Sequence, residues 1–164
     1  MNSYRERYID ELNRHFGVDQ RRINHALKVL ANVELIMEQE KLSEETYKII
    51  IVTALLHDVG IKPAEEKYQS SAGVYQEIEG PPIVRAIMNR LGEPEAIIER
   101  VAYIVGGHHT VMKNNGLDFQ IIWEADLLVN IEEEGLMNSP GISDIIAKNF
   151  RTATGKRIAR EMFL

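Results

Sequence analysis

Two imidazoles and two carboxylates lie where the surrounding sequence is apolar. His57 and Asp58 follow one strongly apolar segment, Asp126 lies inside a second, and His25 falls on the edge of the apolar arc of a helical pattern. A carboxylate buried without a partner costs several kcal/mol or loses its charge, so Asp126 must meet a cationic group. Two imidazole nitrogens and two carboxylate oxygens form a ligand set suited to Mn, Fe, Mg, Co, Ni or Zn.

Each of these residues also has an ordinary structural explanation. Asp126 could take part in a salt bridge or a helix-capping hydrogen bond. A single histidine such as His25 at a helix edge is more often a hydrogen-bonded core residue than a ligand. The four residues together, spread over three helical segments, favour a metal site over four unrelated contacts.

The elements that must position these side chains are helices. Asp19 and Ser43 are typical N-cap residues, and the apolar residues after them recur with a helical period. Pro81 and Pro82 are favoured at the start of a helix, whereas the segment 62–73 has no steady period and is predicted to be a loop with one short turn at most. No run of strand alternation is present. The predicted helices are about 20–38, 43–58, 81–91, 94–106, 117–132, 142–150 and 156–163.

These segments predict an all-α fold, a single-domain helical bundle of about seven helices. Residues 1–164 are enough for one domain and too few for two ordinary ones. The helices within 142–163 are expected to pack on the residues before them. Their apolar faces, with Ile142, Ile145 and Ile146, could instead pack against a second subunit, so a homodimer stays an open alternative.

Composition and charge exclude several classes of function. The chain has no cysteine, which removes disulfides, thiolate nucleophiles and iron–sulfur clusters. Its 19 Lys and Arg against 25 Asp and Glu give a net charge of −6, which disfavours a nucleic-acid polymer as partner but allows a small phosphorylated substrate. Residues 1–11 are charged throughout, unlike a signal peptide, and no apolar segment approaches the ~20 residues that span a bilayer. A cytoplasmic protein with no membrane partner is therefore expected.

The order and framing of the four side chains resemble a known family. His25, the adjacent pair His57 and Asp58, and Asp126 are similar to the H…HD…D signature of the HD-domain superfamily of metal-dependent phosphohydrolases. The resemblance covers residues 22–130. It implies a helical bundle in which these four residues hold one divalent metal ion, and hydrolysis of a P–O bond by a water that the metal activates.

The resemblance also implies roles for residues around the ligands. Asp58 would be both a ligand and the group that orients or deprotonates the attacking water, and Asn130 a hydrogen-bond donor behind the ligands. Arg22 could clamp a substrate phosphate or form an ordinary surface salt bridge. Lys62 is a candidate catalytic residue, although many relatives have a lysine directly after the glycine and here one residue intervenes. Lys67 is a weaker candidate for binding substrate phosphate.

A second pair of histidines could belong to a second metal site. His108 and His109 follow two glycines and resemble the additional histidines of HD proteins with a two-metal centre. Such centres usually draw a further histidine from the preceding helix, where this chain offers Glu77 and Glu79 instead. One metal is expected, and a second, held by these four residues, stays open against substrate binding by His108 and His109. The fifth histidine, His15, is predicted to be a surface residue.

The function that these patterns favour is a metal-dependent phosphohydrolase. Its substrate would be a phosphomonoester or phosphoanhydride of a small metabolite, a nucleotide in the first instance. A dinuclear-iron HD oxygenase is an alternative, because His108, His109, Glu77 and Glu79 could hold a second iron. A non-catalytic HD module that binds a nucleotide and regulates a partner is another, although a scaffold has no physical need for four convergent ligands.

Overall fold

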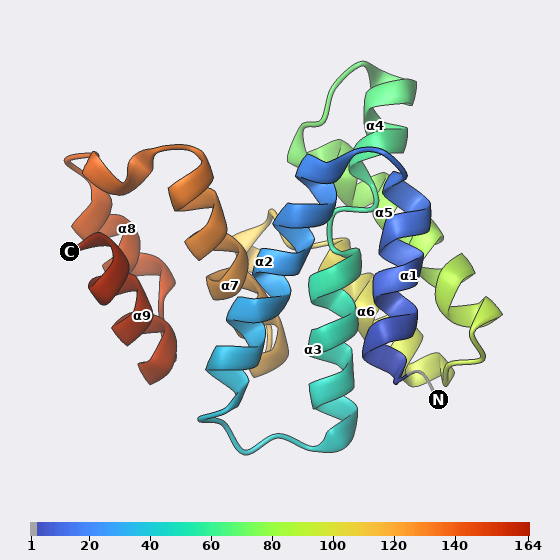
Figure 1. The fold of residues 1–164 in the computed structure, drawn as a ribbon, viewed down its shortest axis with the longest axis horizontal. Coiled ribbons are helices and arrows are strands. Elements are labelled where there is room, and N and C mark those ends of the chain that lie inside the picture. Colours follow the sequence, from blue (N-terminus) through green and yellow to red (C-terminus); the bar gives the residue numbers. More distant parts are fainter. Residues whose placement is uncertain (1–2) are drawn as a thin grey trace.

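The computed structural model describes residues 3–164, and within them the fold is entirely helical (Figure 1). The prediction of an all-α fold is confirmed, with nine α-helices in the described residues where the sequence indicates about seven. The α-helices are α1 (Tyr4–Phe16), α2 (Gln20–Met37), α3 (Glu44–Leu56), α4 (Ile61–Tyr68), α5 (Gly73–Arg90), α6 (Glu95–Val105), α7 (Leu117–Glu133), α8 (Ile142–Asn149) and α9 (Ala153–Phe163). Two short 3-10 helices, η1 (Val111–Lys113) and η2 (Leu136–Asn138), flank α7.

From residue 49 onward, helix α3 is buried on every side and forms the centre of the bundle. Its residues 49–56 are an unbroken buried run that packs against α1, α2, α6 and α7. A helix that is apolar all round belongs in a protein interior. Because α3 ends at Leu56, the next two residues, His57 and Asp58, are held in the middle of the molecule at the end of a rigid element.

Helix α1 is absent from the predicted set because its many charged residues obscure its period. Tyr8, Leu12 and Phe16 are spaced four residues apart and form a buried stripe against the core. Ser3 caps the helix, since its side chain accepts a hydrogen bond from the backbone N–H of Glu6. The same type of cap is seen at the two predicted positions, Asp19 and Ser43.

The prediction of a loop over 62–73 is wrong for most of that segment. Pro63 lies in the first turn of α4, where the missing backbone N–H leaves no helical hydrogen bond unmade. The helix buries only Ile61 and Ala64, and two buried residues are too few to show a period. Pro63 therefore belongs to a helix in a segment that was predicted to be a loop.

The prediction that a helix starts at Pro81 and Pro82 is also wrong. Helix α5 begins at Gly73 and continues through both prolines. Its buried residues include Val84 and Met88, and it packs against α4 on one side and α6 on the other. This packing outweighs the two backbone hydrogen bonds that the prolines cannot donate.

A close approach of backbones holds α5 against the turn after α3. A Cβ atom added at Gly60 would lie 2.5 Å from the carbonyl oxygen of Gln76 and 2.8 Å from the backbone nitrogen of Gly80. Gly80 in turn has no room for a side chain, because a Cβ there would lie 2.7 Å from Cγ1 of Val105. The first residues of α5 are thereby placed beside the end of α3.

We expect Gly60→Ala to lower the free energy of unfolding by about 2–3 kcal/mol, because neither neighbouring backbone can move aside cheaply. Urea denaturation followed by circular dichroism measures the change. Gly141→Ala is the matched control, since a Cβ there meets nothing within 4 Å and its φ is −90°. Equal stabilities of the two variants would contradict the close approach.

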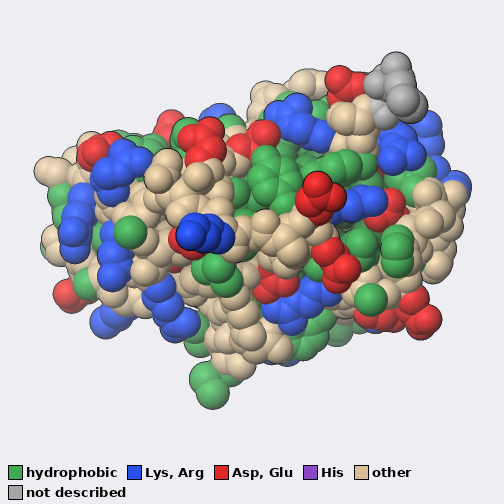
Figure 2. Space-filling model, turned by 90° about the horizontal axis from the view of Figure 1, so that it is seen from below, with side chains coloured by type: hydrophobic (Ala, Val, Ile, Leu, Met, Phe, Trp, Pro, Cys, Tyr) green, Lys and Arg blue, Asp and Glu red, His purple; other side chains and the backbone are tan. Residues whose placement is uncertain are grey.

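The last two helices form a separate layer on α7, at the left in Figure 1. Their apolar residues join Leu128 and Ile131 of α7 in a small second core, and Ile142 and Ile146 pack there within the same chain, with Ile145 partly buried against it. Figure 2 shows lysine and arginine side chains gathered over this end of the molecule. The exposed basic residues are Lys148, Arg151, Lys156, Arg157 and Arg160. No described helix combines the length and apolarity needed to cross a bilayer.

Candidate metal centre

Five side chains from four parts of the fold meet beside the end of α3. His25 comes from α2, His57 and Asp58 from the end of α3 and the turn after it, His108 from the turn after α6, and Asp126 from the middle of α7. The helices that carry them pack on one another, α2 against α3 and α7, and α3 against α6 and α7. The elements predicted to position these residues are therefore neighbours.

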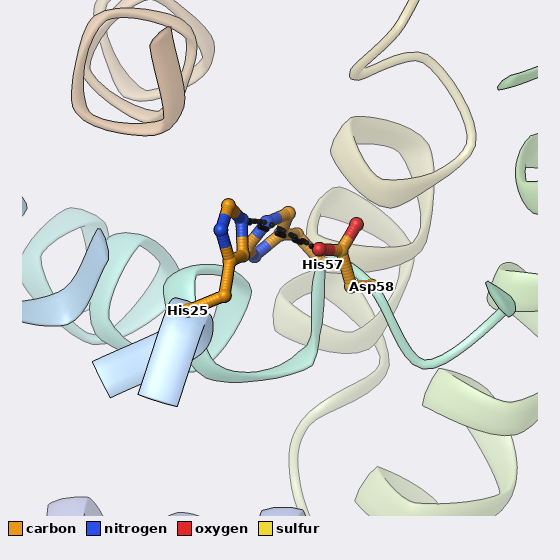
Figure 3. Close-up of side chains that lie close together, drawn as sticks. All are labelled: His25, His57 and Asp58. Atoms are coloured by element: carbon orange, nitrogen blue, oxygen red, sulfur yellow. Dashed lines mark hydrogen bonds and ion pairs between the residues drawn. The ribbon is translucent and has the colours of Figure 1, made fainter. Parts of the chain in front are cut away.

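Ligand atoms of His25, His57 and Asp58 lie within 4.8 Å of one another, and Asp126 contacts both histidines. Nε2 of His25 lies 3.0 Å from Oδ1 of Asp126, 3.3 Å from Oδ2 of Asp58 and 3.3 Å from Nε2 of His57. Nε2 of His57 lies 3.2 Å from the Asp58 oxygen and 3.4 Å from the Asp126 oxygen. Figure 3 shows His25, His57 and Asp58 pointing toward one another.

These separations are the ones that a divalent metal requires. Neighbouring ligands at about 2.1 Å from one ion lie roughly 3.0 Å apart in octahedral geometry and roughly 3.4 Å apart in tetrahedral geometry. The five measured distances run from 3.0 to 3.4 Å. We therefore expect an ion to fit with little movement of the side chains.

Hydrogen bonds on the far side of each ring orient the imidazoles. His57 donates its Nδ1–H to the carbonyl oxygen of Ala54 at 2.8 Å, and His108 donates its Nδ1–H to the carbonyl oxygen of Val105 at 2.7 Å. His25 donates its Nδ1–H to the carboxylate of Glu133 at 3.2 Å. In each case Nε2 faces the cluster, which is the arrangement of a metal-binding histidine.

The charges of the cluster call for a cation. Burial alone would lower the pKa of His57, but Asp58 and Asp126 raise it well above the ordinary value. Burial alone would raise the pKa of the Asp58 carboxyl, but His57 and His108 hold it well below its usual range. Nε2 of His108 is buried and has no hydrogen-bond partner among the described residues. A divalent cation would replace the protons that the two carboxylates otherwise draw onto the imidazoles, so the donor set fits such an ion.

A second group of ligand atoms shares Asp58. One ligand atom each of Asp58, His108 and His109 lies within 4.8 Å of the others. Gln76 donates its amide N–H to the carbonyl oxygen of Ser71 at 2.6 Å, so its Oε1 accepts from Nε2 of His109 at 2.9 Å. This contact leaves the Nδ1 lone pair of His109 free. Burial, and then the charge of His108, lower the pKa of His109 to about 4.

The two glutamates expected to complete a second metal site are engaged in other contacts. Glu77 accepts hydrogen bonds from the backbone N–H of His109 at 3.0 Å and from Oγ1 of Thr110 at 2.9 Å. Glu79 accepts one from the Tyr68 hydroxyl at 3.2 Å. Glu77 thus holds the loop that carries the histidines, and nothing in the sequence signalled that Gln76, its neighbour, contacts His109.

A cleft of about 230 Å³ opens onto the cluster. Besides His25, Asp58 and Asp126, it is lined by Arg21, Arg22, Ile61, Gln76, His109, Asn130, Glu133 and Glu134. The cleft thus has two arginines at its rim and carboxylates around the cluster, and Asn130 lies in its wall.

Of the three residues predicted to meet substrate phosphate, one lines this cleft and two do not. Arg22 lines it, and its Nη2 also donates to Oε1 of Glu65 at 2.9 Å. Lys62 is exposed on α4 and is not among the residues that line the cleft. Lys67 is exposed at the end of α4, with Nζ 3.6 Å from Oε2 of Glu79, and lies outside the cleft as well.

His15 is not the surface residue that the sequence predicts. It is half buried, and its Nε2–H donates to the carbonyl oxygen of Val59 at 2.9 Å, next to Asp58. Burial lowers the pKa of His15, and the nearby charge of Lys62 lowers it further, although the hydrogen bond opposes the shift. The histidine therefore stays neutral in the folded protein and supports the turn that carries Asp58.

The lowered pKa of His15 makes the stability depend on pH. Below about pH 6.5 the unfolded chain takes up a proton at this residue that the folded chain resists, so acid reduces the free energy of unfolding. His15→Gln keeps an N–H donor but cannot titrate. We expect the free energy of unfolding of the wild type to fall more steeply than that of the variant between pH 7 and pH 5, and parallel curves would contradict this assignment.

Glu133 is a functional residue that the sequence analysis missed. It lies seven residues after Asp126, two helical turns along the same face of α7, and this spacing could have signalled it. Its carboxylate fixes His25 and makes the ring a better electron donor. We expect Glu133→Gln to weaken Mn²⁺ binding about 10–100-fold in calorimetric titration. Glu134→Gln, on the neighbouring residue of the same cleft, is the control; equal affinities of the two variants would contradict the role of Glu133.

Comparisons with known proteins bear on this geometry. A family model described as "HD domain" matches residues 22–141 of the chain. A solved structure from an uncultured Thermotogales bacterium, described as a predicted HD superfamily hydrolase, is similar in fold, with a TM-score of 0.65 and 20% sequence identity over 95% of this chain and 83% of that one. No curated protein sequence matches the chain.

Proposed function

Because the chain belongs to the HD-domain family, we propose that it is a metal-dependent phosphohydrolase that acts on a phosphomonoester or phosphoanhydride of a small metabolite, a nucleotide in the first instance. The observation that carries the proposal is the cluster of His25, His57, Asp58 and Asp126, in which Nε2 of each histidine lies 3.0–3.4 Å from an oxygen of each carboxylate. In both histidines of this set, the hydrogen bond that Nδ1–H donates turns Nε2 toward the cluster.

A divalent ion held by these residues would supply positive charge to the phosphoryl oxygens and make a water molecule more acidic. Residues of the chain would orient the water and take up its proton. Asp58 faces the cluster with Oδ2 and turns Oδ1 toward Nε2 of His108 at 3.4 Å, so it is placed to orient the attacking water and accept its proton. His108 is placed to share that proton, since its Nε2 has no other partner among the described residues.

The cleft favours a small anionic substrate over a polymer. Arg21 and Arg22 stand at its rim, where they can meet phosphate oxygens that extend away from the metal site. Glu133 and Glu134 lie nearby and repel additional negative charge. The volume of about 230 Å³ exceeds that of a phosphoryl group, and a larger substrate extends beyond the cleft. Lys62 lies outside this lining and receives no role.

A substrate panel tests the proposal. The purified protein is incubated with Mn²⁺ and, separately, with nucleoside mono-, di- and triphosphates, sugar phosphates and p-nitrophenyl phosphate, and released phosphate or pyrophosphate is measured. We expect release from at least one compound, its loss with EDTA and its recovery with added Mn²⁺. A nucleotide that raises the melting temperature without release from any compound would contradict the proposal and favour a binding module.

One observation favours a second candidate function, an oxygenase with two irons. The group of Asp58, His108 and His109 shares Asp58 with the first set, so these residues could hold a second ion beside the first. Two irons per chain after anaerobic loading, together with substrate-dependent uptake of O₂, would favour this reading. Phosphate release with Mn²⁺ alone and no uptake of O₂ would exclude it.

A further inference from the structure

A second pocket lies on the other side of the wall formed by His109, Asp126 and Asn130. It has a volume of about 170 Å³, and it shares those three residues with the metal cleft. The pocket is further lined by His108, Trp123, Leu127 and Asn149. We call it the Trp123 pocket. Asp126, a candidate metal ligand, thus lines both cavities.

The charges of the two cavities differ. The metal cleft carries Arg21 and Arg22, whereas no lysine or arginine lines the Trp123 pocket. Asp126 is the one carboxylate among the residues that line it. A phosphate chain therefore belongs in the cleft, and the Trp123 pocket suits an uncharged part of the substrate.

The walls of the pocket are suited to a polar ring. The Trp123 indole is fixed by its Nε1–H, which donates to Oδ1 of Asn149 at 3.1 Å. Nδ2 of Asn149 donates one hydrogen to the carbonyl oxygen of Ile145 at 2.8 Å. The amide thus has one N–H and one lone pair left, which can pair with an acceptor and a donor on the edge of a ring. Trp123 and Leu127 supply apolar surface for the ring itself.

The volume of the Trp123 pocket and the place of Asn149 in the chain indicate which group binds there. An apolar cavity of about 150 Å³ holds benzene, so the volume of about 170 Å³ accommodates one substituted six-membered ring. Asn149 ends α8 and lies beyond residues 22–141, the part that matches the family model. The amide that would form hydrogen bonds with the ring therefore comes from a helix outside the part of the chain that matches the family model.

We propose that the Trp123 pocket binds the uncharged single-ring group of the substrate, a pyrimidine base, and that Asn149 selects it. This inference rests on the proposed function, because it takes the phosphoryl group to lie at the metal ligands. Under it, pyrimidine nucleotides are hydrolysed in preference to purine nucleotides. Trp123 and Asn149 set that preference and take no part in the bond cleavage.

Direct binding can be measured without any hydrolysis. The chain has one tryptophan, so its fluorescence reports on this pocket alone. We expect uridine or cytidine to change the fluorescence saturably, and adenosine, guanosine and ribose at the same concentrations to leave it unaltered. A response to the purine nucleosides equal to that of the pyrimidines, or no response to any nucleoside, would overturn the inference.

Substitution of the selecting amide provides the second arm. Asn149→Leu keeps the side-chain volume and removes both hydrogen-bonding groups, and Asn89→Leu, on the exposed face of α5, is the matched control. The ratio of kcat/KM for a pyrimidine nucleotide to that for ribose 5-phosphate should fall about 10-fold or more in the first variant and stay at the wild-type value in the second. An unchanged ratio in Asn149→Leu would overturn the inference.

The two arms separate this inference from the proposed function. Hydrolysis of phosphate compounds without any nucleoside response would leave the phosphohydrolase standing and remove the pyrimidine pocket. Saturable uridine or cytidine binding without hydrolysis of any compound would support the pocket and remove the phosphohydrolase. If Asn149→Leu fails to fold, the fluorescence of the wild type still decides.

Discussion

Replacing Asp58 with alanine is expected to reduce metal-dependent phosphate release about a thousand-fold or more. Asp58 is the one residue common to both groups of ligand atoms, and it is also placed to take the proton of the attacking water. Loss of a metal ligand and of a general base removes several kcal/mol of transition-state stabilisation, and each 1.36 kcal/mol is a factor of ten in rate. Initial rates at saturating substrate and Mn²⁺, with the wild type measured in parallel, give the change.

Two further variants distinguish the loss of the Asp58 charge from the loss of its side chain and from an unspecific effect of removing a carboxylate. Asp58→Asn keeps the shape of the side chain but offers a neutral oxygen, and we expect it to lose nearly as much activity as the alanine variant. Asp144→Ala removes an exposed carboxylate from α8 and should leave the rate at the wild-type value. An Asp58→Ala protein that retains a tenth or more of the wild-type rate would contradict both roles given to Asp58.

Replacing Glu124 with alanine is expected to lower the free energy of unfolding by about 3–5 kcal/mol. Glu124 is fully buried on α7, and its two oxygens accept four hydrogen bonds. The donors are the side-chain amide of Gln120, the backbone N–H groups of Arg151 and Thr152, and the Thr152 hydroxyl. Alanine would leave buried N–H groups without acceptors and open a cavity.

The glutamine variant is the matched control for this effect. Glu124→Gln keeps one carbonyl oxygen for the backbone N–H groups, and its amide can donate to the Thr152 hydroxyl, so we expect a loss of about 1 kcal/mol. Chemical denaturation monitored by far-UV circular dichroism measures both variants. A loss below about 1 kcal/mol in Glu124→Ala would show that the contact between α7 and the start of α9 is not what stabilises the C-terminal pair.

The buried carboxylates of α7 show what can be predicted from the sequence and what cannot. Asp126 stands out because an apolar stretch surrounds it, and the same is true of Glu124 two residues earlier. The two side chains face opposite ways, Asp126 toward α2 and α3 and Glu124 toward the segment before α9. Local pattern reveals that a group is buried, but the partner that satisfies it is set by tertiary packing.

The candidate metal ligands were identifiable because each follows from local chemistry. His57 and Asp58 end an apolar helix, and the period of α2 turns His25 inward. The contacts that orient these ligands join distant segments, as between His15 and Val59 or Glu133 and His25. No period or motif encodes such pairs, and they emerge only once the helices are packed.

The central claim is that one divalent ion binds to His25, His57, Asp58 and Asp126, and equilibrium dialysis against Mn²⁺ followed by elemental analysis measures it directly. We expect the wild type to retain at least one ion per chain and Asp126→Ala, confirmed as folded by circular dichroism, to retain less than a tenth as much at the same free Mn²⁺ concentration. A wild type that retains no Mn²⁺, or a folded variant that retains as much as the wild type, would contradict the claim.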